Sequence, residues 1–184
     1  MDDKNKIKEE IEEGISLLKN SSFFEAIKIF ENIIKKDNTN FQSYYLLGTS
    51  YLQLKKLDLA ELNLRNSLKL NKNLTPAMHN LGITLSIKKQ YLNAEEQFLK
   101  VLKFEPKNLD TLTELGRNCE LSNNLIEAKK YYNEVLSLDP GNKKVNGLFG
   151  RMLINSGYHK LGLNYLKKST GLIRFNETDF EIIK

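Results

Sequence analysis

Apolar residues recur at helical spacing along residues 41–70. In the first half of this segment they stand three or four residues apart, at Tyr44, Leu47, Tyr51 and Leu54. A second series follows two lysines, at Ala60, Leu64 and Leu68. The pattern predicts two amphipathic helices, over residues 41–54 and 57–70, each about 20 Å long, with a break at residues 71–73.

The same two-helix pattern returns every 34 residues. A glycine marks the first helix of each copy, at Gly14, Gly48, Gly82, Gly116 and Gly150. A small residue follows twelve positions later, at Ala26, Ala60, Ala94, Ala128 and Gly162. Four positions further on stands a large residue, at Phe30, Leu64, Phe98, Tyr132 and Leu166. A fixed period of this length indicates a stack of helix pairs rather than one closed core.

The small residues have a packing role in this prediction. Two antiparallel helices that cross at about 8–10 Å need small side chains at the crossing, so we expect Gly48 to face Ala60. Each pair then leaves one apolar face exposed until the next pair covers it. The predicted fold class is all-α, an α-solenoid of five helix-turn-helix repeats.

The period divides the chain into a tail of residues 1–6, five repeats and an end segment. The repeats span residues 7–40, 41–74, 75–108, 109–142 and 143–176, and the end segment spans residues 177–184. Glu10 and Glu13 replace large apolar residues in repeat one, which predicts an exposed first helix of the capping type. At the other end we expect a short capping helix, from Asn176 to Ile183, over the last apolar face.

Repeat five holds half of the chain's ten glycines, at Gly147, Gly150, Gly157, Gly162 and Gly171. A glycine inside a helix costs about 1 kcal/mol relative to alanine. We therefore predict that repeat five is the least stable repeat.

The order of large and small residues within each unit resembles the tetratricopeptide repeat family, whose pattern is a large residue, Leu-Gly, Tyr, Ala, Phe and Pro. Repeat two has Tyr44, Leu47-Gly48, Tyr51 and Ala60. Repeat three has Met78, Leu81-Gly82, Leu85, Ala94, Phe98 and Pro106. Repeat four has Leu112, Leu115-Gly116, Cys119, Ala128, Tyr132 and Pro140. The resemblance covers residues 7–176. It implies a right-handed α-solenoid that acts in protein–protein interaction and is not an enzyme.

In this family the first helix of each repeat lines a concave surface, at positions two, five, six, nine, twelve and thirteen. The resemblance therefore implies a groove that binds an extended peptide or protein segment. Its central residues are Tyr45, Thr49, His79, Asn80, Ile83, Thr113, Arg117, Arg151 and Asn155, with Gln42, Leu46, Glu114, Glu120 and Lys144 beside them.

One well-defined ligand class does not fit. Family members that hold the C-terminal carboxylate of heat-shock chaperones use Lys and Asn in one repeat, Asn in the next, and Lys and Arg in the third. The corresponding residues here are Tyr45 and Thr49, then Asn80, then Asp110 and Glu114. Only Asn80 matches, and two carboxylates would repel that of the ligand, so a chaperone carboxylate clamp is not expected.

Three groove residues have alternative interpretations. Arg117 and Arg151 share position nine of adjacent repeats, so they bind an anionic group as a pair or form internal salt bridges. Glu114 and Glu120, three residues on either side, favour a salt bridge at Arg117, whereas Arg151 has no such neighbour. His79 is a ligand contact or a solvated or backbone-bonded histidine.

Composition narrows the classes of function. The net charge of +5, from 28 Lys and Arg against 23 Asp and Glu, is interpreted as a solvated surface spread along the chain. No basic run with interleaved aromatics favours nucleic acid. One cysteine and two distant histidines allow no disulfide or metal site, no cofactor is expected, and Cys119 is interpreted as a buried packing residue. Without a signal peptide or a membrane-spanning stretch, the prediction is a cytoplasmic protein with no membrane partner.

A second hypothesis belongs to another class of function. The array is then the substrate-recruiting or oligomerisation region of a larger enzyme, such as a sulfotransferase, glycosyltransferase or hydroxylase, whose catalytic domain lies outside residues 1–184. Bacterial proteins that resemble this one carry such arrays ahead of those domains. Whether the reading frame continues past Lys184 distinguishes the two hypotheses.

Overall fold

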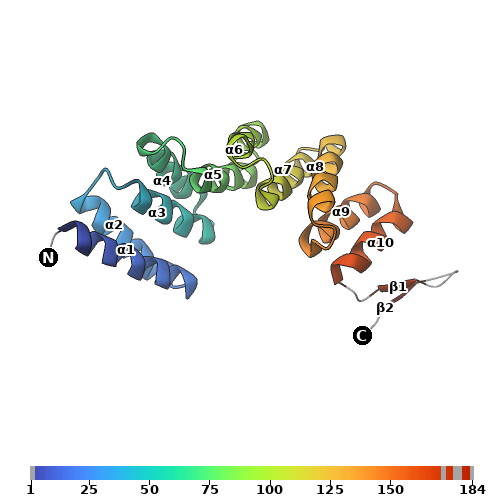
Figure 1. Ribbon diagram of the computed structural model, residues 1–184, viewed down its shortest axis with the longest axis horizontal. Helices are drawn as coiled ribbons and strands as arrows, with labels where there is room; N and C mark the ends of the chain where they lie inside the picture. Colours follow the sequence, from blue (N-terminus) through green and yellow to red (C-terminus); the bar gives the residue numbers. More distant parts are fainter. Residues whose placement is uncertain (1–2, 171–172, 176–179, 183–184) are drawn as a thin grey trace. The chain divides into compact units, whose positions relative to one another are not determined.

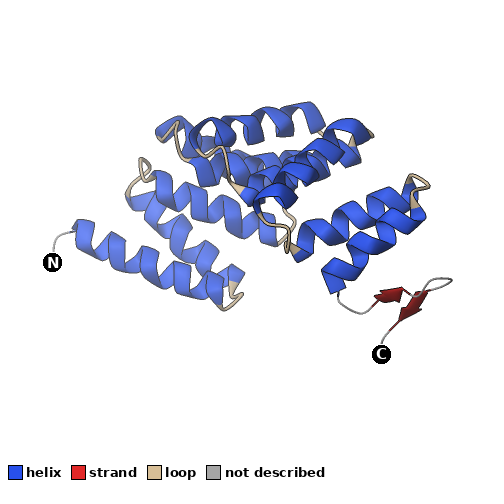
Figure 2. Ribbon diagram, turned by 45° about the vertical axis from the view of Figure 1, so that its right-hand side comes forward, coloured by secondary structure: helices blue, strands red, loops and turns tan. Residues whose placement is uncertain are grey.

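The computed structural model describes residues 3–170, 173–175 and 180–182, with side chains described for residues 5–170. The chain falls into two compact units, Met1–Phe104 (unit 1) and Glu105–Lys184 (unit 2). Unit 1 contains the helices α1 (Asp3–Lys19), α2 (Phe23–Lys36), α3 (Phe41–Gln53), α4 (Leu57–Leu70), α5 (Thr75–Ile87) and α6 (Tyr91–Phe104). Unit 2 contains α7 (Leu109–Leu121), α8 (Leu125–Leu138), α9 (Lys143–Asn155), α10 (His159–Thr170) and the strands β1 (Ile173–Phe175) and β2 (Phe180–Ile182) (Figures 1 and 2).

Within each unit the helices pack as successive antiparallel pairs: α1 with α2, α3 with α4 and α5 with α6 in unit 1, and α7 with α8 and α9 with α10 in unit 2. The second helix of a pair also contacts the first helix of the next pair, as α2 does α3, α4 does α5 and α8 does α9. This stacking confirms the predicted all-α solenoid plan. The helices predicted over residues 41–54 and 57–70 match α3 and α4 to within one residue.

The regularly spaced glycines make close contact with a large residue of the second helix in each pair. A Cβ added at Gly82 would lie 2.6 Å from the Phe98 ring, and one at Gly48 would lie 2.8 Å from Leu64 Cγ. The glycine therefore lies closest to the large residue sixteen positions later, a contact that the sequence analysis, which paired Gly48 with Ala60, did not name. A helical side chain covers the surface over the turn before its own Cα, which brings the large residue back onto the glycine.

The turns and starts of the helices also follow the period. Each first helix ends in a turn with one residue of left-handed φ, at Ser21, Lys55, Lys89, Asn123 and Gly157. Three of the first helices begin after an asparagine whose side-chain oxygen accepts a backbone N–H three residues on, at 2.9, 2.9 and 3.0 Å for Asn40, Asn108 and Asn142. Such N-caps satisfy amides that have no partner within the helix.

The first helix is less exposed than predicted. Glu13 is exposed, but the Glu10 side chain is only 20% exposed and pairs with Lys36 of α2 at 2.7 Å. Ile11 of α1 is buried in the core cluster of unit 1, together with Phe30 and Leu47. The helix α1 is therefore anchored on its inner side, and only part of it faces solvent.

The predicted C-terminal capping helix is wrong for the described residues. Phe180–Ile182 forms β2, antiparallel to β1, with Ile173 opposite Ile182 and Phe175 opposite Phe180. Isoleucine and phenylalanine favour strands, and an isolated helix of two turns is marginal in water. Asn176 and Ile183, the ends of the predicted helix, lie outside the described residues.

Candidate binding groove

Five of the predicted groove residues lie on α3 and α5, which contact each other in unit 1. Asn80 of α5 donates its side-chain amide to the Thr49 hydroxyl at 2.9 Å, although the two residues are 31 positions apart. The Thr49 hydroxyl in turn donates to the Tyr45 carbonyl at 2.9 Å. The structure thus brings Thr49 and Asn80 together as a neutral polar pair that links repeats two and three.

The other three residues of this set take part in packing. The His79 ring meets the buried Phe98 ring edge-on, with centroids 5.9 Å apart. Tyr45 packs against the core cluster of unit 1, and Ile83 is half-buried. Each therefore offers a partner only the part of its surface that the packing leaves open.

The remaining four predicted residues lie on α7 and α9, which contact each other in unit 2. Arg151 and Asn155 are exposed, and 54% of the Arg117 side chain is exposed. Thr113 differs, because it is only 3% exposed and its hydroxyl donates to the Leu109 carbonyl of its own helix at 2.7 Å. Thr113 is therefore unavailable to a ligand in this structure.

Glu114 connects two cations in unit 2. Its carboxylate lies 2.8 Å from Lys144 Nζ of the next repeat and 3.8 Å from Arg117 Nη1, and its side chain is 13% exposed. The salt bridge predicted at Arg117 is present on the Glu114 side. Glu120, the second expected partner, instead accepts a hydrogen bond from the Tyr132 hydroxyl at 2.8 Å. Burial raises the pKa of Tyr132, and the Glu120 carboxylate raises it further.

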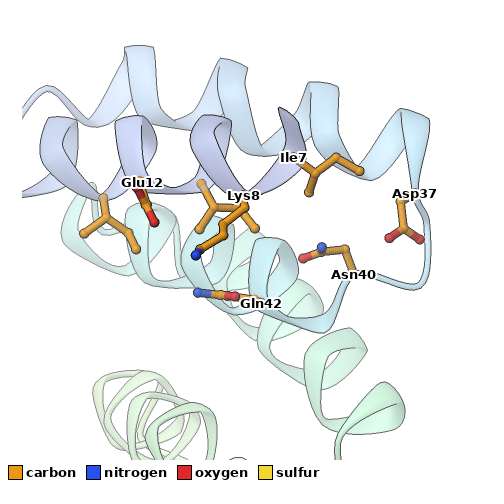
Figure 3. Close-up of a pocket in the computed structure, with 8 residues that line it drawn as sticks. Ile7, Lys8, Glu12, Asp37, Asn40 and Gln42 are labelled. Atoms are coloured by element: carbon orange, nitrogen blue, oxygen red, sulfur yellow. The ribbon is translucent and has the colours of Figure 1, made fainter. Parts of the chain in front are cut away.

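A groove between α1 and α3 of unit 1 contains residues that the sequence prediction left out. Its volume is about 550 Å³, and it is lined by Ile7, Lys8, Ile11, Glu12, Ile15, Asp37, Asn40 and Gln42. Lys8 and Gln42 point toward the same space from opposite helices (Figure 3). The three isoleucines, four residues apart on α1, form an apolar stripe with polar groups around it.

A signal for this groove was present in the sequence. Lys8, Ile11, Glu12 and Ile15 occupy positions two, five, six and nine of repeat one, four of the positions that line the concave surface in the family. Glu10 and Glu13 predict an exposed capping helix. Those glutamates lie at other positions of the same helix, so they say nothing against a groove beside it.

Other kinds of site find little support in the described part of the chain. Cys119 is 2% exposed, which agrees with its predicted packing role. No group of three His, Cys, Asp or Glu side chains in that part of the chain is arranged to hold a metal ion. None of the described helices is long and apolar enough to cross a membrane.

Comparison with known proteins identifies the repeats. The model of the tetratricopeptide repeat matches residues 41–74, 75–108 and 109–142, more than half of the chain. The chain belongs to the tetratricopeptide repeat family. The repeats of this family make protein-interaction scaffolds, and their fold is generally non-enzymatic.

The proteins related to this chain differ in how much of their own length the match covers. It is 33% identical over 129 residues to the uncharacterized protein ycf37 of Guillardia theta, which covers 65% of this chain and 72% of that protein. It is 29% identical over 143 residues to the BBSome complex member BBS4 of Bos taurus, covering 77% of this chain but spanning only 27% of BBS4. Among solved structures, MamA from Desulfovibrio magneticus RS-1, from residue 41 to its end, matches with a TM-score of 0.80 at 22% identity, covering 91% of this chain and 94% of that one. At this identity the match shows a shared fold.

Proposed function

We propose that this chain is a protein-interaction module that binds an extended segment of a partner protein along the first helices of its repeats. In unit 1 the binding surface consists of the groove between α1 and α3 and continues over Tyr45, Thr49, His79, Asn80 and Ile83. The observation that carries the proposal is the groove itself. It offers an apolar stripe and a polar rim at repeat positions that line the ligand surface in the family.

The chemistry of this groove suits a peptide better than a small anion or a metal ion. Ile7 and Ile15 are half-buried, so an apolar side chain laid against them removes further apolar surface from water. The side-chain amides of Asn40 and Gln42 both donate and accept hydrogen bonds, as an extended peptide backbone requires. A segment with one large apolar residue between polar neighbours therefore fits.

The test uses peptides selected from a random display library against the whole chain, with affinities measured by fluorescence anisotropy. The groove variant combines Ile7→Ser, Lys8→Ala and Gln42→Ala. The control variant combines Leu62→Ser with Lys28→Ala, which are exposed on α4 and α2. We expect the groove variant to bind at least about tenfold more weakly, and the control variant to change little.

Two further outcomes are informative. Backbone amide chemical shifts recorded with the bound peptide are expected to change on α1, α3 and α5. If the changes gather on α2, α4 and α6, or if the control variant loses as much affinity as the groove variant, the groove assignment is wrong. Unfolding curves of both variants show whether the loss reflects binding or stability.

The match to BBS4 favours a second candidate function. This chain spans 27% of that protein, so arrays of this kind also occur inside longer chains. In this alternative, residues 1–184 are part of a larger enzyme of the sulfotransferase, glycosyltransferase or hydroxylase type. They recruit its substrate or mediate its oligomerisation. The parent reading frame tests it, because the alternative requires a catalytic domain after Lys184.

A further inference from the structure

Two neighbouring helices of unit 1 contain no charged residue. Neither α3 nor α5 has an Asp, Glu, Lys or Arg, although these residue types make up 28% of the chain. Each of the other described helices carries at least three of them. The first helices of repeats four and five, α7 and α9, carry four and three. The place of α3 and α5 within their repeats therefore does not account for the missing charge.

The uncharged surface of these two helices is open to solvent. Side chains four residues apart lie on one face of a helix. We call this surface the neutral strip, and it consists of Tyr45, Thr49 and Gln53 on α3 and of His79, Ile83 and Ile87 on α5. Gln53 is exposed, 51% of Ile87 is exposed, and the other four side chains are half-buried. Exposed helix positions are therefore uncharged here although nothing in unit 1 covers them.

The neutral strip offers a ligand no counter-charge. The hydroxyl of Thr49 and the amide of Asn80 beside it are neutral and bonded to each other at 2.9 Å. Lys88, the residue after α5, already lies 2.6 Å from Asp58 and 2.8 Å from Glu61 of α4. A charged side chain laid on the strip would lose hydration without gaining an ion pair. Depletion of charged residues is also what distinguishes the core of a protein interface from the rest of a surface.

One end of the neutral strip is apolar. Ile83 and Ile87 stand four residues apart on α5, so their side chains lie side by side. An apolar side chain that covers them removes further apolar surface from water. The strip therefore provides a second apolar contact, separate from the isoleucines of the groove between α1 and α3.

We propose that the part of the partner segment that lies over α3 and α5 is uncharged and places a second apolar side chain against Ile83 and Ile87. The inference rests on the proposed function, because it names the chemistry of the segment that the same surface binds. Charge is acceptable only at the ends of the segment, since α1 carries Lys8 and Glu12.

The separation of the two apolar contacts sets the length of the segment. α1 contacts α3, and α3 contacts α5. Packed helices lie about 8–10 Å apart, so α1 and α5 are separated by on the order of 20 Å. An extended chain advances about 3.3 Å per residue, so two apolar residues about six positions apart reach both contacts.

The experiment uses a fluorescein-labelled peptide of Ser and Gln, about twelve residues long, with two leucines about six positions apart. In two derivatives the residue midway between the leucines is Glu or Lys. In two control derivatives the same Glu or Lys stands at an end of the peptide, outside the leucines. Fluorescence anisotropy gives the affinity of each peptide for the whole chain.

We expect Glu or Lys midway between the leucines to weaken binding at least about tenfold, and the same residue at an end to change it less than about twofold. Both signs of charge should act alike, because loss of hydration rather than repulsion opposes binding. This distinguishes the inference from an effect of the net charge of +5 on the chain.

Ile87→Ser tests the second apolar contact. We expect it to weaken binding of the neutral peptide at least about fivefold. The matched control is Ile126→Ser, which removes an isoleucine that is 82% exposed on α8 in unit 2, and it should change the affinity less than about twofold. Unfolding curves of both variants separate a loss of binding from a loss of stability.

Several results would overturn the inference. The neutral peptide fails to bind, the Glu or Lys derivative binds as tightly as the neutral peptide, or Ile87→Ser and Ile126→Ser have equal effects. Self-association of the chain alone in analytical ultracentrifugation, abolished by Ile87→Ser, would assign the strip to a second copy. The proposed function is judged separately. If library-selected peptides bind the unaltered chain and lose affinity in the groove variant, that function stands even where this inference fails.

Discussion

Units 1 and 2 link successive repeats through different chemistry. In unit 1, Thr49 and Asn80 form a neutral pair across repeats at 2.9 Å, beside a groove with three isoleucines. In unit 2, the link across repeats is ionic, from Glu114 to Lys144 at 2.8 Å, and Arg151 stands without a carboxylate partner among the described residues. Side chains at the predicted groove positions thus also link successive repeats, by a neutral hydrogen bond in unit 1 and by a salt bridge in unit 2.

The two units also differ in how helix pairs close. In repeat two, α4 carries Ala60, which is fully buried, and α3 presents Gly48 to Leu64. In repeat five, Gly150 and Gly162 face each other, and a Cβ at Gly162 would lie 2.6 Å from the Gly150 carbonyl oxygen. The α9–α10 pair is therefore closed so tightly that it has no room for the alanine that repeats one to four contain.

The largest expected effect comes from adding that alanine. In Gly162→Ala the new Cβ meets backbone at Gly150 and Ile154 Cγ1 at 2.6 Å, so the helices must separate, and we expect a loss of about 1–3 kcal/mol in the free energy of unfolding. Urea unfolding followed by circular dichroism measures it. Gly141→Ala is the control, since the nearest atom to its Cβ is 3.6 Å away. A stabilised Gly162→Ala protein would show that α9 and α10 are no closer than α3 and α4.

The turn of repeat five supplies the next effect. Gly157 has a φ of 86°, in the left-handed region, where a side chain is strained. We expect Gly157→Ala to cost about 1 kcal/mol. The reverse change in unit 1, Lys89→Gly, relieves strain at a φ of 61° and should leave stability unchanged or raise it. Equal destabilisation by both changes, in urea midpoints, would contradict this account of the turns.

The fold was predictable from the sequence because the signal is repeated five times. Spacing alone located the helix pairs and predicted α3 and α4 closely. It failed at the C-terminal end, where Phe180–Ile182 has no second copy for comparison and forms a strand. It also did not name the contact of Gly48 with Leu64, because spacing along the chain does not tell which residue on the facing helix lies closest to the glycine.

The candidate site was less predictable. Repeat positions placed Thr49 and Asn80 on neighbouring first helices but did not predict their hydrogen bond. Burial of Thr113 and packing of His79 against Phe98 likewise depend on neighbours that position does not specify. In repeat five, Gly150 and Gly162 meet at the helix crossing, where the sequence analysis expects small residues, whereas the left-handed turn at Gly157 was not predicted. That repeat five is the least stable stays a prediction, and amide exchange compared with repeat three tests it.

A smaller effect is expected at alkaline pH. Burial, and then the hydrogen bond to Glu31 at 2.9 Å, raise the pKa of Tyr51 to about 12. Because the unfolded chain loses this proton first, near the ordinary value of 10.0, the contribution is complete below pH 10 and is lost as the pH rises to about 12. Glu31 is exposed, so we expect less than about 1 kcal/mol. In Tyr51→Phe the urea midpoint should fall less steeply with pH between these values. If the midpoint falls as steeply as in the unaltered chain, ionisation of Tyr51 is not the cause of the fall.

The smallest effect concerns the ionic links between repeats. Lys88 lies 2.6 Å from Asp58 and 2.8 Å from Glu61 with a side chain 22% exposed, whereas Lys144 has Glu114 at 2.8 Å and is 55% exposed. Exposed pairs contribute little to stability, so both alanine variants should lower the urea midpoint only slightly, Lys88→Ala more than Lys144→Ala. The difference should vanish in about 1 M NaCl, where charges are screened over about 3 Å. Persistence of the loss at high salt would mean that the Lys88 stem contributes through packing rather than through charge.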